Sequence, residues 1–151
     1  MDEMKDTDVV ADPASGTTRS THRARGLVVT GILATLAAMV ATTLAAALAT
    51  AVGVDFEVPD GGETIPLPGI AVVTGFFSLV GLAVAVALRR WSARPAEWFV
   101  RTTVSLTAIS LVPPLLAGAN AATTATLIGL HLVAATVMIP TLARTLRTAA
   151  A

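Results

Sequence analysis

The sequence predicts an all-α, four-helix transmembrane bundle, and three observations support that fold class. The segments 27–54, 64–88 and 102–143 contain no Asp, Glu, Lys or Arg. A helix needs about 20 apolar residues to cross a hydrocarbon layer about 30 Å thick, so the third segment is long enough for two crossings. Only 13% of the residues are charged, whereas soluble domains carry about 25%. The helices of a soluble bundle with this composition would present uncharged faces to water.

The N-terminal segment 1–25 is expected to be a disordered cytoplasmic tail, acidic at first and then basic. It has no apolar periodicity, and its charge changes sign near Arg19. Basic residues directly before a span resist translocation, which keeps this end in the cytoplasm. A cleaved signal peptide is the alternative, helped by small residues at Ala47, Ala49 and Ala51. The apolar run that follows the tail is, however, far longer than the core of a signal peptide.

The membrane domain is expected over residues 26–147, with a short C-terminal tail at 148–151 and no room for a second folded domain. Pro66 and Pro68 open the second span, where proline is tolerated, and Asn120 is placed to cap the fourth. Pro113 and Pro114 have no backbone N–H, which predicts a kink near the outer end of the third span. The four spans are expected at about 26–53, 68–88, 98–117 and 121–143.

The distribution of Lys and Arg predicts the orientation. All ten lie in the N-terminal tail, around the loop between the second and third spans, or at the C-terminus, and the two opposite loops contain none. Because cytoplasmic loops collect Lys and Arg, both termini are expected in the cytoplasm. Nine of the ten are Arg, which is typical of high-GC bacterial coding and predicts a bacterial cytoplasmic membrane. The expected partners are membrane lipids and not nucleic acid, with anionic headgroups at Arg89, Arg90, Arg94, Arg144 and Arg147.

Small residues recur on one face of each of the first two spans. Such rows let two helix backbones approach closely, either inside the bundle or between two copies of the chain. Internal packing, a homo-oligomer and a membrane partner protein therefore all stay open. The rows are Gly31, Ala34, Ala38, Ala41, Ala45 and Ala49 in the first span, and Ala71, Thr74, Gly75, Ser78, Gly81 and Ala85 in the second.

The loop between the first two spans, residues 54–67, alternates apolar and acidic residues and contains the turn sequence Pro59-Asp60-Gly61. This pattern predicts a short extracytoplasmic β-hairpin whose apolar face rests on the helix ends. Asp55 and Glu57 would face outward and are candidate functional residues. A solvated loop, a partner-docking surface and a divalent-cation site are the alternatives, although the spacing matches no defined calcium loop.

His131 is the one ionisable residue expected near the membrane midplane, and such residues suggest function. A structural hydrogen bond, a proton relay and a cofactor ligand are its possible roles. Haem between helices normally takes two axial ligands, and the spans hold no second histidine, so no cofactor is expected. We expect His131 to face the bundle interior and to bond the third span near Ile109 or Ser110, or the hydroxyl of Ser78.

No hydrolase, phosphate-loop, metalloprotease or dinucleotide motif occurs in the chain, and the absence of cysteine removes thiol chemistry. The sequence therefore predicts no enzyme and no metal site. It favours a small structural or interaction protein, an accessory component of the cell membrane. The alternative is a transporter-like or proton-relay component that uses His131.

Several short motifs, taken together, resemble a known family. They are residues 53–58 (Gly-Val-Asp-Phe-Glu-Val) before a Pro-rich entry into the second span, Pro113-Pro114, Gly118-Ala119-Asn120 and His131-Leu132-Val133. With this set the chain, from about residue 26 to 147, is similar to domain-of-unknown-function family 6069. The resemblance implies a small four-span bacterial membrane protein. It implies no activity, cofactor or catalytic residue.

Overall fold

The computed structural model describes residues 14–58 and 63–150, and it is all-α apart from one short strand pair. Residues 1–13, residues 59–62, which include the whole predicted turn Pro59-Asp60-Gly61, and residue 151 lie outside the described residues. Four helices are long and apolar enough to cross a membrane, over Ala24–Ala51, Leu67–Trp91, Pro95–Leu116 and Ala121–Ala149. The predicted fold class of four long apolar helices is therefore confirmed. The helices are α1 (Ala14–Ala51), α2 (Leu67–Trp91), α3 (Pro95–Ser110), α4 (Val112–Leu116) and α5 (Ala121–Ala150).

Prolines and one asparagine define most of the helix starts. Pro66 precedes α2, and Pro95 opens α3, where the missing N–H would have had no intrahelical partner. The backbone N–H of Thr123 donates to Oδ1 of Asn120 at 2.8 Å, so the predicted cap of α5 is confirmed. The composition of these segments thus sets where the helices begin.

Helix α1 begins at Ala14, well inside the segment expected to be a disordered tail. The helix therefore includes residues 14–25 of the expected tail segment. Extending an existing helix by one residue adds a hydrogen bond without the cost of a new nucleus, so a stable span can carry a polar extension. Pro13 directly precedes the first helical residue and is the last proline before Ala51.

The third span is interrupted at Leu111, which separates α3 from α4. Pro113 and Pro114 cannot donate to the carbonyl groups one turn earlier, and the N–H of Leu111 bonds Thr107 O at 3.2 Å and Ala108 O at 3.3 Å. The predicted kink of the third span is confirmed.

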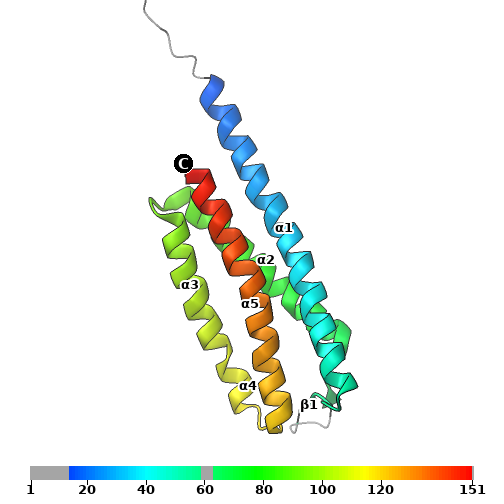
Figure 1. Ribbon diagram of the computed structural model, residues 1–151. Coiled ribbons are helices and arrows are strands. Elements are labelled where there is room, and N and C mark those ends of the chain that lie inside the picture. Colours follow the sequence, from blue (N-terminus) through cyan, green and yellow to red (C-terminus); the bar gives the residue numbers. More distant parts are fainter. Residues whose placement is uncertain (1–13, 59–62, 151) are drawn as a thin grey trace, which may run out of the picture.

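The long helices form a bundle in which α5 is central (Figure 1). Helix α1 packs along α2 and α5, and α3 packs along α5 and meets α2 beside their connecting loop. Helix α2 crosses behind α5, from the end of α1 to the start of α3. We call the end with the α2–α3 loop and the C-terminus the arginine-rich end, and the end with the two strands the hairpin end.

The small row of α1 packs inside the bundle. Gly31, Ala34 and Ala38 are buried, and a Cβ at Gly31 would overlap the side chain of Leu82 on α2. The hydroxyl of Thr42 also donates to Oγ1 of Thr74 on α2 at 3.2 Å. The described contacts of Gly31, Ala34 and Ala38 therefore lie inside the bundle.

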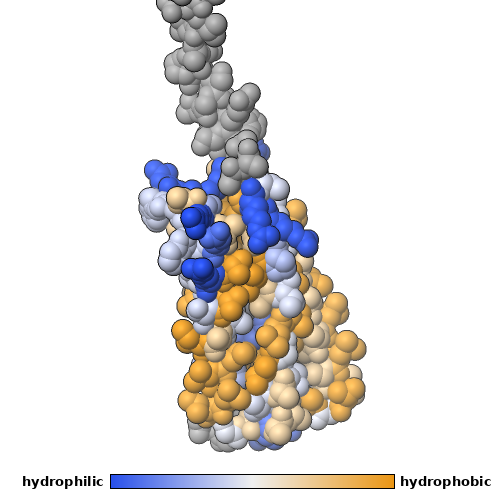
Figure 2. Space-filling model, turned by 60° about the vertical axis from the view of Figure 1, so that its left-hand side comes forward, coloured by the Kyte–Doolittle hydropathy of each residue, from blue (hydrophilic) through white to orange (hydrophobic). Residues whose placement is uncertain are grey.

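Large apolar side chains cover the outside of the helices, as Figure 2 shows for one face. Hydrophilic residues gather at the arginine-rich end in the same view. An apolar exterior of this kind suits lipid and not water, in agreement with a multi-pass membrane protein. Among the most exposed are Leu33, Leu44, Leu48, Phe76, Phe77, Ile109 and Leu116.

Between α1 and α2, the two-residue strands β1 (Glu57–Val58) and β2 (Glu63–Thr64) pair antiparallel, with Glu57 opposite Thr64. Phe56 before β1 is only 3% exposed and packs with Ala46, Ile70 and Leu130. Its φ of 48° is unusual for a residue with a Cβ, and it turns the phenyl ring onto the helix ends.

Candidate functional site: a groove between three helices

A groove of about 680 Å³ runs between α2, α3 and α5. Leu130 and Met138 of α5, both buried, form part of its floor. Its rim is exposed on both sides, at Phe77 of α2 and at Ile109 of α3. The groove therefore opens between α2 and α3 toward the surroundings of the bundle, at the depth where lipid chains would lie.

The groove follows from the crossing of the helices and from missing side chains. Helix α2 meets α3 at the arginine-rich end and lies nearer α1 at the hairpin end, so α2 and α3 separate along their length (Figure 1). Gly81, Ala134 and Ala135 leave the space between them unfilled, and a Cβ at Gly81 would meet nothing within 4 Å.

His131 lies in this groove together with Ser78 and Ser110, so three of the five candidate residues line one cavity. The predicted bond from His131 to the third span or to Ser78 is not formed. Its Nδ1 instead lies 2.8 Å from the carbonyl oxygen of Leu127, one turn earlier in α5. The hydroxyl of Ser110 donates to Thr107 O of its own helix, so both predicted partners on neighbouring helices remain unbonded to the imidazole.

The tautomer of His131 follows from this contact. A carbonyl oxygen can only accept, so Nδ1 carries the proton and donates to Leu127. In the neutral imidazole, Nε2 then keeps a lone pair and can only accept. Within the described residues Nε2 has no donor, so it offers one open acceptor to the groove.

The hydroxyl groups of the groove divide into two sets. Ser110 donates to Thr107 O at 2.8 Å and Thr103 donates to Phe99 O at 2.7 Å, so both are bound to their own helix. The hydroxyl of Ser78, a residue that is only 6% exposed, forms no hydrogen bond within the described part of the chain. The hydroxyl of Thr107 forms none there either. The remaining lining hydroxyl, that of Thr74, accepts from Thr42. The lining of the groove therefore includes two free hydroxyls and the Nε2 acceptor.

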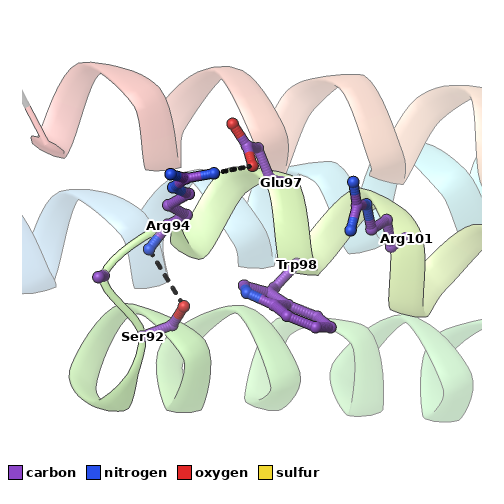
Figure 3. A pocket seen from close by; sticks show the side chains of 6 residues that line it. Ser92, Arg94, Glu97, Trp98 and Arg101 are labelled. Carbon is purple, nitrogen blue, oxygen red and sulfur yellow. Dashed lines mark hydrogen bonds and ion pairs between the residues drawn. The ribbon is translucent and has the colours of Figure 1, made fainter.

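A second, smaller pocket of about 250 Å³ lies at the arginine-rich end (Figure 3). Arg94 pairs with Glu97 at 3.7 Å, and the guanidinium of Arg101 lies 5.8 Å from the centre of the Trp98 ring. These side chains are exposed, and exposed pairs of this kind contribute little to stability. The pocket places an aromatic ring among arginines, as an interfacial belt would.

Asp55 and Glu57, the remaining candidates, lie at the hairpin end away from the groove. Nδ2 of Asn120 donates to Oδ1 of Asp55 at 3.3 Å, which ties the segment before β1 to the start of α5. Among the side chains that the structure describes, no three of the His, Asp or Glu type gather closely enough to hold a metal ion. Asp60 lies outside the described residues.

A family model matches residues 22–148 of the chain, and its description is a family of unknown function, DUF6069. The chain belongs to the DUF6069 family. The match covers all four long apolar helices, so the bundle and its groove lie within the family region. No curated protein and no solved structure matches the chain.

The groove of this DUF6069 chain was not predicted from its sequence, although some of its residues were. Gly81 and Gly75 belong to the same row of small residues, which predicts close packing for both. Of the two, only Gly75 meets a neighbour, because its Cβ position is 2.9 Å from Sδ of Met39. The sequence signal for the groove is the length of the small row on α2. A row of six small residues is longer than one close helix contact requires, so part of it can be left uncovered.

Proposed function

We propose that this protein is a non-enzymatic binding component of the membrane, and that its groove receives an apolar constituent of the bilayer. One observation carries the proposal: the groove of about 680 Å³ is largely apolar, and its mouth lies between two exposed apolar helix faces. Binding sites for small molecules have volumes of about 300–1,000 Å³, mostly apolar walls and a few polar groups that orient the ligand. The groove fits each of these features.

The alternative, a proton relay or transporter-like pathway through His131, has less support. A pathway needs several polar groups in series, whereas His131 is the only ionisable residue from 102 to 143. The hydroxyls of Ser110 and Thr103 donate to carbonyl groups of their own helix and not to a neighbour in a chain. Ligand binding requires only the groups without a hydrogen-bond partner, which are Nε2 of His131 and the hydroxyls of Ser78 and Thr107.

The absence of a formed serine–histidine contact supports the non-enzymatic reading. Nucleophilic catalysis by serine requires a base within hydrogen-bonding distance of the hydroxyl. Ser110 donates to Thr107, the hydroxyl of Ser78 has no hydrogen bond, and His131 is bonded only to Leu127, so neither serine of the groove is bonded to the imidazole within the described residues. The groove residues therefore support recognition better than acyl transfer.

We infer that both termini face the cytoplasm and that the strand pair forms a hairpin on the opposite side of a bacterial cytoplasmic membrane. The inference rests on the ten Lys and Arg residues, all of which avoid the two loops on the hairpin side. Anionic lipid headgroups are the expected partners of the arginine-rich end, since the side chains there are mostly exposed. The residues concerned are Arg89, Arg90, Arg94, Arg144 and Arg147.

Gly81→Leu tests the proposed function because Gly81 lines the groove and a Cβ there has nothing within 4 Å, so the added side chain occupies groove space. Native mass spectrometry of the protein released from phosphatidylcholine nanodiscs that contain dodecane should show bound dodecane for the parent chain and little for Gly81→Leu. Gly129→Leu is the matched control, since Gly129 also has nothing within 4 Å but does not line the groove. Equal retention by the parent and by Gly81→Leu would contradict the proposal.

A further inference from the structure

The open polar groups of the groove lie at one depth. Both α2 and α5 begin at the hairpin end, and Ser78 and His131 follow their starts by about 16 and 15 Å along the helix axes. Thr107 lies about 18 Å along α3 from the opposite end. In a hydrocarbon layer about 30 Å thick, all three are close to the midplane.

Above and below this level, the walls of the groove are mostly apolar, and the hydroxyls of Thr74, Thr103 and Ser110 are already hydrogen-bonded to Thr42, Phe99 and Thr107. Ile65 and Leu127 line it toward the hairpin end, and Val84 and Phe99 toward the arginine-rich end. No Asp, Glu, Lys or Arg is among the described residues that line it. A charged ligand would therefore have no counter-ion there, and burying its charge would be costly.

The hydrogen-bonding groups of the groove further limit which polar group the ligand can carry. Nε2 of His131 can only accept, so it selects a ligand group that donates. The hydroxyls of Ser78 and Thr107 can donate or accept, so they complement the oxygen of the same ligand group. A hydroxyl meets both conditions, whereas a ketone or an ether oxygen cannot donate to Nε2.

We propose that the groove binds a neutral lipid whose central polar group is a hydroxyl, with that hydroxyl donating to Nε2 of His131. This inference rests on the proposed function and names the ligand class. An unpaired hydroxyl in hydrocarbon is unfavourable, so a neutral lipid that carries one at mid-depth gains a partner only in the groove. The apolar arms of the molecule would occupy the two ends of the groove.

The test uses three probes of one chain length: dodecanol with its hydroxyl at mid-chain, the corresponding ketone, and dodecane. Each is titrated into the parent chain in phosphatidylcholine nanodiscs, and binding is measured together with the nitrogen NMR signal of His131. We expect the alcohol to bind about 3- to 12-fold more tightly than the ketone, the range expected for one net hydrogen bond. The Nε2 signal of His131 should move with the alcohol only, and His22, the other histidine, serves as the internal reference.

Two variants separate the parts of the proposal. His131→Leu should bind the alcohol and the ketone equally, and Ser78→Ala should weaken both relative to dodecane. If the alcohol, the ketone and dodecane bind the parent chain equally but fail to bind Gly81→Leu, the hydroxyl assignment is overturned and the proposed function stands. If no probe binds, or if Gly81→Leu instead changes the oligomeric state, a second copy or no ligand occupies the groove, and both proposals are overturned.

Discussion

The imidazole of His131 is held by its own helix, because Nδ1 donates to the carbonyl oxygen of Leu127 at 2.8 Å. That oxygen belongs to the regular hydrogen bonding of α5, so removing the imidazole leaves no polar group unpaired. His131→Leu should therefore fold almost normally, with a loss below about 1 kcal/mol, since hydrogen bonds in membranes average about 0.6 kcal/mol. Thermal unfolding in detergent measures this, and a large drop in Tm would indicate that the imidazole joins two helices.

Replacing Asn120 is predicted to lower the stability of the protein more than its exposed position would indicate. Its Oδ1 caps α5 at the N–H of Thr123, and its Nδ2 donates to Asp55. Loss of such a cap costs about 1 kcal/mol, so Asn120→Ala should lower Tm measurably. Asp55→Ala is the control, because it removes only the exposed contact and should change stability little. Equal losses in the two variants would contradict the capping role.

At the level of helices, the small residues of α2 serve two purposes, and paired substitutions separate them. Gly75→Leu forces Met39 to move, because the Cβ position is 2.9 Å from its Sδ. Overpacking of this kind costs about 1–3 kcal/mol. Gly81→Leu points into the groove, where nothing lies within 4 Å, and should be as stable as the Gly129→Leu control. Unfolding curves of the three variants in one detergent provide the measurement, and an equal loss for Gly75→Leu and Gly81→Leu would refute the distinction.

The existence of the long helices was predictable because an uncharged run of sufficient length has few other stable structures in a membrane. The break at Leu111 was predictable too, since the missing N–H groups of Pro113 and Pro114 are a property of the residues themselves. The start of α1 at Ala14 was not, because a polar extension of a helix has no hydrophobic signature.

The groove could not be derived from periodicity, because it depends on the angle at which α2 crosses the other helices (Figure 1). A helical wheel places Ser78 and Gly81 on the small face of α2 but does not say whether a neighbour covers them. The partner of His131 was predicted wrongly for a different reason. Depth along the helices places His131 and Ser110 at one level, but each side chain donates to a carbonyl oxygen of its own helix, Leu127 O and Thr107 O.

For the whole molecule, charge is segregated between the two ends of the bundle. The arginine-rich end contains the loop between α2 and α3 and the C-terminus, whereas the hairpin end carries Asp55 and Glu57. Because Lys and Arg resist translocation and acidic residues do so much less, this asymmetry orients the chain during insertion. The groove, which reaches from Ile65 just before α2 to Val84 on α2, would then extend through both leaflets.

The orientation has a direct test because the chain contains no cysteine, so each introduced thiol is the only one present. Thr64→Cys at the hairpin end and Ala93→Cys in the α2–α3 loop both replace exposed residues outside the groove. If both termini are cytoplasmic, a membrane-impermeant maleimide should label Thr64→Cys in intact cells with an opened outer envelope. Ala93→Cys should react only after the inner membrane is permeabilised, which also shows that its thiol is accessible. The reverse pattern would invert the orientation, and labelling of both positions in intact cells would contradict the four-span arrangement, because residues 64 and 93 lie at opposite ends of a single crossing by α2.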